Sequence, residues 1–301
     1  MPRTNFKELL DAGVHFGHLK RKWNPAMAPY IFMERNGIHI INLEKTIEKI
    51  DEAALAMKHL SRSGKKVLFV ATKKQAKEIV SEKVKAAGMP YVTERWPGGM
   101  LTNFPTIRKA VKKMTTIDKM ATDGTFMNLS KRERLQVTRQ RAKLEKNLGS
   151  IADLVRLPSA LFIVDVCKEH IAVREAKRLG IPVFAMVDTN SDPTDIEFPI
   201  PANDDASKSI SLIIDIMCQA IAEGMNEKKN EKDKESEPQQ RDKKVMRKEL
   251  ETSAMPAALI EAIVEEEEEI DEEEEIDVLA DEDYDDIVPD FIEDTDEEEL
   301  I

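Results

Sequence analysis

The chain has 301 residues and a formal net charge of −13, and this charge is unevenly distributed. Residues 1–225 hold 36 Lys and Arg against 26 Asp and Glu, a net of +10, whereas residues 226–301 hold 9 against 32, a net of −23. A basic part joined to a strongly acidic part indicates nucleic-acid contact by the basic part and a solvated acidic extension. We therefore predict one domain over 1–225.

Cysteine usage and hydropathy exclude several classes of protein. Cys167 and Cys218 lie far apart without CxxC spacing, which predicts two reduced core thiols and neither a disulfide framework nor a zinc site. The first residues have the pattern of an amphipathic helix, not of a signal peptide, and no apolar run approaches the roughly 18–20 residues of a membrane span. We expect a soluble cytoplasmic protein.

Short apolar runs alternate with helical patterns along the basic part. The predicted strands are 38–41, 67–71, 91–93, 161–166 and 183–187. Apolar residues spaced three and four apart predict helices over 46–61, 74–87, 168–179 and 206–223, the last ending at Gly224. Nearly continuous apolar strands alternating with helices predict an α/β fold with a doubly wound parallel sheet.

Residues 105–148 interrupt this alternation. Two helical patterns, 106–120 and 131–148, flank a turn around Asp123 and Gly124, with no strand between them. Residues 101–150 carry 12 Lys and Arg against 4 Asp and Glu. We predict an inserted, protruding helical hairpin that is basic along its length.

The acidic extension falls into two parts. Residues 226–254 are almost wholly polar and predict a disordered linker, and 255–301 form an acidic tail that we expect to be mostly disordered, with one or two helical turns possible over 255–264. Isolated apolar residues in the tail are typical of acidic-hydrophobic interaction segments, although a solvated spacer explains them equally well: Tyr284, Ile287, Val288, Phe291 and Ile292. One hypothesis is that the tail contacts a basic neighbour or folds back on the basic domain before assembly.

The N-terminal stretch AGVHFGHLKRKWNP is dense in residue types that contact RNA. Lys and Arg meet phosphates, while Trp and His stack on unpaired bases. The candidates are His15, His18, Lys20, Arg21, Lys22, Trp23 and Asn24. A metal site at His15 and His18 lacks further ligands nearby, so we expect none; core packing is a serious alternative for Trp23 and His15.

The loop RWPGGMLTN follows a predicted strand, so its paired glycines could cradle phosphate through backbone amides. It matches neither GxGxxG nor GxxxxGK[ST], which argues against a nucleotide site. Asp165, Glu169 and His170 form a possible acid–base group at another strand end, but no nucleophile or metal triad accompanies them. We predict no catalytic residues and no cofactor.

Eight ordered motifs resemble one family: AGVHFGH, WNP, RNGIHIINLEKT, RWPGGMLTN, DGTF, EHIAVREA, GIPVFAMVDTNSDP and IPANDDA. Over roughly residues 5–224 the chain resembles the bacterial small-subunit ribosomal protein numbered two, the universal S-two family. The resemblance implies a Rossmann-like sheet with a coiled-coil hairpin, no enzymatic activity, and binding to the sixteen-S ribosomal RNA at the junction of head and body. It also implies docking of neighbouring small-subunit proteins, including the large messenger-capturing protein numbered one. The long acidic tail departs from the family pattern.

We expect the protein to act by binding and positioning folded RNA. Its Lys and Arg side chains would neutralise phosphates, and its loops would fit the shape of the RNA. Besides the N-terminal candidates, the predicted RNA-binding residues are Arg35, Asn36, Lys73, Lys74, Arg95, Trp96, Gly98, Gly99, Asn103, Arg108, Lys109, Lys112, Lys113, Arg132, Arg139, Arg141 and Lys143. A solvated face remains the alternative for each hairpin base. Two other functions stay open: an RNA-binding regulator that acts off the ribosome, and an enzyme that binds a phosphate ligand at the strand ends.

Overall fold

A computed structural model describes residues 3–123, 126 and 129–252, with side chains as far as residue 230. The chain divides into two units, Met1–Lys232 and Asp233–Ile301, and every strand of the described residues belongs to the first. The predicted tail, 255–301, lies outside the described residues. Within the described part, no helix combines the length and apolar character needed to cross a membrane.

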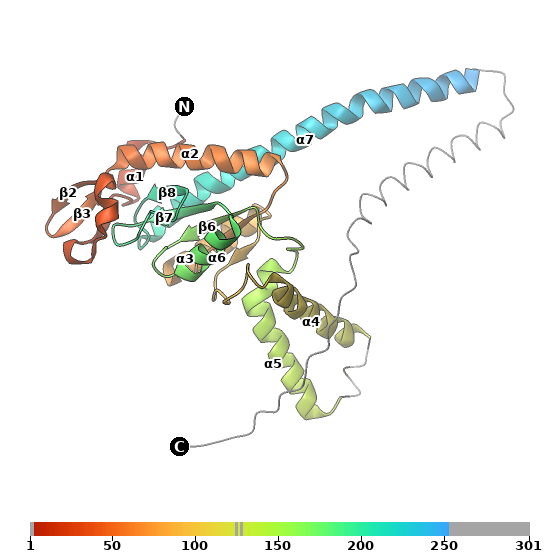
Figure 1. Ribbon diagram of the computed structural model, residues 1–301. Helices are drawn as coiled ribbons and strands as arrows, with labels where there is room; N and C mark the ends of the chain where they lie inside the picture. The colour runs from red at the N-terminus through yellow and green to blue at the C-terminus, as the bar shows by residue number, and fades with distance from the viewer. Residues whose placement is uncertain (1–2, 124–125, 127–128, 253–301) are drawn as a thin grey trace. The chain divides into compact units, whose positions relative to one another are not determined.

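Eight strands and seven α-helices make up the described fold (Figure 1). The strands are β1 (Phe16–Leu19), β2 (Ile31–Arg35), β3 (Ile38–Ile41), β4 (Val67–Val70), β5 (Tyr91–Val92), β6 (Ala160–Val164), β7 (Val183–Val187) and β8 (Phe198–Pro201). The helices are α1 (Phe6–Asp11), α2 (Leu43–Arg62), α3 (Lys74–Ala86), α4 (Phe104–Thr122), α5 (Lys131–Leu148), α6 (His170–Leu179) and α7 (Ser207–Thr252). Short 3-10 turns cover Lys20–Lys22, Pro25–Tyr30 and Gly149–Ile151.

The central sheet is parallel throughout, in the order β5-β4-β6-β7-β8. Its central strands are buried on both faces, because alternate side chains enter two separate apolar cores. Phe69, Phe162 and Phe184 enter the core that α2, α3 and α7 cover. Leu68 and Ile163 enter the opposite core, beneath α6 and the base of α4 and α5. This confirms the predicted doubly wound parallel sheet.

A second, antiparallel sheet of three strands has the order β1-β3-β2. The strand predicted over 38–41 forms as β3 but belongs to this sheet, so its expected place in the parallel sheet is wrong. Neither β1 nor β2 was predicted, because their side chains are largely exposed and carry no apolar alternation. The small sheet presents the N-terminal candidates.

The strand β8 was also missed, since its sequence FPIP contains two prolines. Proline lacks an N–H group and is tolerated in a sheet mainly at an edge. β8 pairs on one side only, with β7, and forms one edge of the parallel sheet. Pro199 and Pro201 therefore mark its position at the edge.

The predicted hairpin forms from α4 and α5, which extend together away from the sheet (Figure 1). Ser130 caps α5 through a reciprocal capping box with Glu133. Met114 and Ile117 are buried along α4, while Leu148 anchors the base of the hairpin in the sheet core. The turn predicted around Asp123 and Gly124 lies partly outside the described residues.

Gly224 does not end α7, so the predicted helix end there is wrong. The helix continues to Thr252, across most of the range predicted as a linker. A Cβ atom at Gly224 would lie 2.4 Å from the carbonyl oxygen of Lys58 and 3.0 Å from Cβ of Ser61, both on α2. The glycine therefore permits close contact between two helix backbones, which a sequence pattern cannot distinguish from a helix stop.

We expect Gly224→Ala to lower the free energy of unfolding by about 1–3 kcal/mol, because overpacking outweighs the better helix propensity of alanine. Urea unfolding measures the loss. The control is Gly98→Ala, at an exposed site where the added Cβ meets no atom within 4 Å. Equal stability of the two variants would show that the contact between α7 and α2 is not tight.

Candidate functional site

The parallel strands deliver a group of charged side chains to one edge of the sheet. Thr72 and Lys73 follow β4, Asp165 follows β6, and Asp188 follows β7. Asp204 and Asp205 follow β8. Because the carboxyl ends of parallel strands share one edge, residues far apart in sequence meet there.

Lys73 lies among three carboxylates at this edge. Its Nζ is 2.8 Å from Oδ1 of Asp204, 2.6 Å from Oδ1 of Asp205 and 3.5 Å from Oδ2 of Asp165. Burial lowers the pKa of Lys73, but the carboxylates outweigh it and raise the pKa. Lys73 is therefore committed to partners within the protein, which argues against the predicted phosphate contact.

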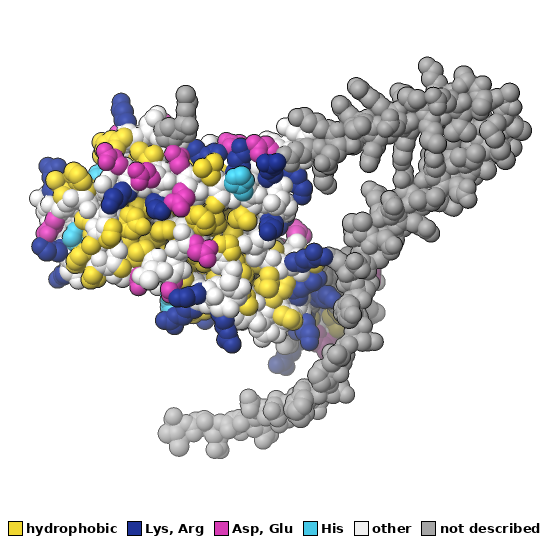
Figure 2. Space-filling view, turned by 45° about the horizontal axis from the view of Figure 1, so that its top comes forward, with side chains coloured by type: hydrophobic (Ala, Val, Ile, Leu, Met, Phe, Trp, Pro, Cys, Tyr) yellow, Lys and Arg dark blue, Asp and Glu magenta, His cyan; other side chains and the backbone are white. Residues whose placement is uncertain are grey.

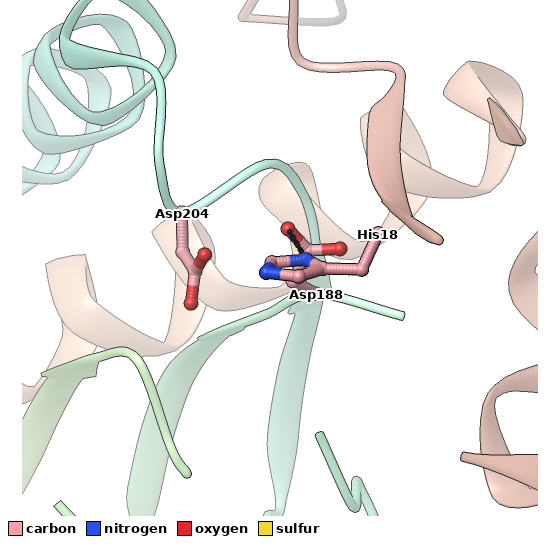
Figure 3. A group of neighbouring side chains, drawn as sticks. All are labelled: His18, Asp188 and Asp204. Carbon is pink, nitrogen blue, oxygen red and sulfur yellow. Dashed lines mark ion pairs between the residues drawn. The ribbon is translucent and has the colours of Figure 1, made fainter. Parts of the chain in front are cut away.

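His18 reaches the same cluster from β1 (Figure 3). Its Nδ1 lies 3.0 Å from Oδ2 of Asp188, and its Nε2 lies 3.4 Å from Oδ2 of Asp205. The contact with Asp188 is an ion pair whose geometry does not meet the requirements of a hydrogen bond. Neither Nδ1 of His18 nor Oδ2 of Asp188 has a hydrogen-bond partner. Asp188 nevertheless raises the pKa of His18. The surrounding acids make this position a poor phosphate site.

Asp204 is fully buried within the cluster. Burial, together with the negative charge of Asp188, raises the pKa of Asp204 to about 7, although Lys73 acts in the opposite direction. Four carboxylates face one lysine and one histidine, so the cluster favours cations and repels phosphate.

The group His18, Asp188 and Asp204 could hold a metal ion. One donor atom from each lies within 4.8 Å of the others, and Oδ2 of both acids lacks a hydrogen-bond partner. One imidazole nitrogen and two carboxylate oxygens are ligands that suit Zn²⁺. Sequence reasoning considered His18 with His15 and expected no metal site. The acids lie 170 and 186 positions further along the chain, and one follows the strand that was missed.

The RWPGGMLTN loop also binds a carboxylate, but one from its own chain. Glu175, on α6, accepts hydrogen bonds from the amides of Gly99 at 2.8 Å and Leu101 at 2.9 Å. It also accepts from the amide of Thr102 and from the indole N–H of Trp96, both at 3.2 Å. The predicted anion cradle thus exists, and Glu175 occupies the position expected for phosphate.

Two predicted contacts of this loop need correction. Trp96 is only 6% exposed and packs in the core against α6, so stacking on an RNA base is not available to it. The amide of Gly99 already donates a hydrogen bond to Glu175, so it does not bind phosphate as predicted. By contrast, Arg95, Gly98 and Asn103 are exposed around the same loop. Asn103 accepts a hydrogen bond from the Thr106 hydroxyl at 2.7 Å.

The other N-terminal candidates divide between internal and exposed roles. Trp23 is half-buried, with its ring centroid 5.1 Å from that of His39, while the half-buried His15 lies beside Phe16. Burial lowers the pKa of His15. Asn24 caps a 3-10 turn by accepting from the amide of Ala26 at 2.9 Å. Arg21 and Lys22 are exposed, as is Lys20, which pairs with Glu34 at 2.7 Å.

The hairpin candidates also divide. Arg108 donates to the carbonyl of Val155 at 2.9 Å. Arg141 bridges Asp118 at 2.5 Å and Glu145 at 2.6 Å. The remaining predicted bases are exposed: Lys109, Lys112, Lys113, Arg132, Arg139 and Lys143. Arg35, Asn36 and Lys74 are exposed as well, with Asn36 at the tip of the β2–β3 turn at φ 54°.

We expect Glu175→Gln to lower the free energy of unfolding by about 2 kcal/mol near pH 7, because charge-assisted hydrogen bonds to buried amides are lost. Burial raises the pKa of Glu175, but the amide hydrogen bonds outweigh it and hold the pKa below 4.5. A depressed pKa in the folded state contributes stability above the unfolded value, and this is lost as pH falls through the folded value.

The difference between wild type and Glu175→Gln should therefore shrink as pH falls below about 4.5. Urea unfolding at several pH values tests this. Glu82→Gln, at an exposed position of α3, is the control and should show little difference at any pH. A loss in Glu175→Gln that does not change with pH would contradict the role of the charge.

Comparison with known proteins agrees with the geometry and with the ordered motifs. Residues 9–224 match the family described as Ribosomal protein S2. A small ribosomal subunit protein uS2 from Parabacteroides distasonis is 75% identical over 221 residues, which cover 73% of this chain and 80% of that protein. The uS2 proteins of Phocaeicola vulgatus and Porphyromonas gingivalis are 75% and 76% identical over 221 residues, covering 73% of this chain and 79% of each. The chain belongs to the ribosomal protein S2 family.

Proposed function

We propose that this chain is a structural constituent of the small ribosomal subunit, where it binds ribosomal RNA and supports translation. Family membership carries the proposal, since relatives about 75% identical are named as proteins of that subunit. Membership of a ribosomal protein family also agrees with the prediction that the chain is not an enzyme. The chain would act in the cytoplasm, as part of the ribosome.

Exposed Lys and Arg side chains on the hairpin support the proposed contact with RNA. Lys109, Lys112 and Lys113 on α4 are exposed, and Arg132 and Arg139 on α5 are exposed as well. Lys and Arg side chains that are exposed to solvent can neutralise phosphates and release counterions. This gives affinity for RNA with little dependence on the nucleotide sequence. The hairpin extends from the sheet (Figure 1), so these Lys and Arg side chains can reach a groove of folded RNA.

A second group of exposed polar residues surrounds the small sheet. Arg21 and Lys22 follow β1, while Arg35 and Asn36 lie at the turn between β2 and β3. They would add contacts outside the hairpin, whereas Arg95 lines a pocket together with Lys143 of α5 and would extend the hairpin region. Two separated contact regions would fix the orientation of the protein on RNA, whereas one would permit rotation.

The finer placement rests on the sequence resemblance. From it we infer a position at the junction of head and body, contact with the sixteen-S RNA, and the large messenger-capturing protein numbered one as a neighbour. The separation of exposed bases into two regions is compatible with a protein that joins neighbouring parts of a subunit. The acidic strand ends would then face away from phosphate.

In a sucrose gradient of cell lysate at low salt, we expect the full chain to sediment with small ribosomal subunits. Raising the salt concentration should release it, because phosphate contacts are screened and counterions compete for them. Immunoblotting of the fractions measures the distribution. A chain that stays at the top of the gradient at low salt would refute the proposal.

We expect the triple variant Lys109→Gln, Lys112→Gln, Lys113→Gln to bind small-subunit RNA more weakly. The slope of log affinity against log salt should fall by about one for each phosphate that the variant no longer neutralises. Filter binding at several salt concentrations measures both quantities. The control is Arg141→Gln, because Arg141 is already paired with Asp118 and Glu145 and should alter the slope little. If triple variant and wild type share one slope, α4 does not contact the RNA.

A further inference from the structure

An open pocket of about 430 Å³ lies at the foot of the hairpin, between α5 and the loop that precedes α4. Arg95, Pro97 and Gly98 line it from the loop. Four side chains line it from α5, at a spacing that places them on one face of the helix: Gln140, Lys143, Leu144 and Asn147. Pockets for small ligands measure roughly 300–1,000 Å³. This pocket can therefore hold one nucleotide, whereas a duplex cannot enter it.

The floor of the pocket is apolar and rigidly supported. Ile107 of α4 and Leu144 are half-buried and pack against the sheet core that contains Leu148. The loop wall is held as well, because Trp96 and the amide of Gly99 donate hydrogen bonds to Glu175. A pocket whose walls are already fixed loses less conformational entropy when a ligand binds.

The polar side chains of the lining have unused hydrogen-bonding groups. Among the described residues, none forms a side-chain hydrogen bond or an ion pair with the side chains of Arg95, Gln140, Lys143 and Asn147. Arg141 on the same helix provides a contrast, because it is paired with two acids. The two amides and the two cations of the pocket are therefore available to a ligand.

The charge of the lining favours an anion. Arg95 and Lys143 line the pocket, and none of its described lining residues is Asp or Glu. A second pocket, at the C-terminal end of α5, instead balances three lysines against three acids, among them Glu94 and Glu145. Figure 2 shows Lys and Arg side chains gathered at the lower right of the folded part, where Figure 1 places the hairpin. A negatively charged ligand would therefore be attracted to this region.

We propose that this pocket binds one unpaired nucleotide of the small-subunit RNA. The inference rests on the proposed function and names one contact within it. An unpaired base has two apolar faces and a polar edge. Ile107 and Leu144 would contact a face of the base, and the guanidinium plane of Arg95 can stack on it in place of an aromatic ring.

The side-chain amides of the pocket match the edge of such a base. Gln140 and Asn147 each carry a donor and an acceptor, so they can pair with the mixed donors and acceptors of a Watson–Crick edge. Arg95 and Lys143 would neutralise the adjacent phosphates. A phosphate alone would use only the two cations and would leave the amides and the apolar floor without a role.

Chemical probing of RNA in intact small subunits tests the proposal. Full chains with an affinity tag, either wild type or the double variant Gln140→Ala, Asn147→Ala, are purified from cells together with the subunits that contain them. Dimethyl sulfate and a carbodiimide then modify the Watson–Crick edges of unpaired bases. We expect one base that the wild type protects to become about tenfold more reactive with the double variant, since hydrogen bonds to its edge are lost. Alanine favours the helix and removes no charge, so the variant should copurify as well as the wild type.

The matched control is Gln136→Ala, which removes the same amide from an exposed position of α5 outside the pocket lining. It should leave the reactivity of that base unchanged. If the control exposes the same base, the effect comes from a general loosening of the hairpin and the proposal is wrong.

A further variant, Arg95→Gln with Lys143→Gln, separates a base from a phosphate. We expect it to release the chain from small subunits at lower salt, because two cations near phosphate are lost. If it does so while the double amide variant leaves every base as protected as the wild type does, the pocket holds a backbone phosphate only, which overturns the proposal.

The same purification separates this inference from the proposed function. A wild-type chain that does not copurify with small subunits would refute the proposed function and the nucleotide pocket together. Copurification with the same base reactivities for wild type and double variant would refute the nucleotide pocket alone.

Discussion

The carboxylate of Glu175 holds the loop from which the hairpin starts. It gathers the amides of Gly99, Leu101 and Thr102 and the indole of Trp96, so the loop before α4 is attached to α6 and, through α6, to the parallel sheet. A buried loop would otherwise leave several N–H groups without acceptors, at a cost of about 1–3 kcal/mol each. Together with Leu148 in the sheet core, this contact fixes the base of the hairpin and hence the direction of the exposed Lys and Arg side chains of α4 and α5.

Charge is segregated within the basic domain as well as along the chain. Lys and Arg side chains are exposed on the hairpin and around the small sheet, whereas Asp side chains converge at the carboxyl ends of the parallel strands. In enzymes with doubly wound sheets this edge carries the ligand site. In this chain Lys73 offsets part of the charge of these acids, and the surfaces that we propose for RNA contact lie elsewhere. The same sheet thus serves as a scaffold that keeps opposite charges apart.

Local sequence predicted the elements that bury a continuous apolar face. The strands over 67–71, 91–93, 161–166 and 183–187 and the helix over 74–87 formed within two residues of their predicted bounds. Apart from the missed strands, the errors concern residues whose role depends on distant partners. Gly224 faces Lys58 across two helices, Trp96 packs beneath α6, and His18 meets Asp188. A sequence pattern gives residue type and spacing, but these contacts join positions 79 to 170 residues apart, so no local pattern could reveal them.

The prolines of β8 have a consequence for the chain while it is free in solution. An open sheet offers unpaired backbone groups at its edges, where another chain can add a strand and begin to aggregate. Pro199 and Pro201 leave β8 without two of its N–H donors, and at the opposite edge β5 is only two residues long. Neither edge is a good template for a further strand. The edges of the parallel sheet therefore disfavour association of free chains through added strands.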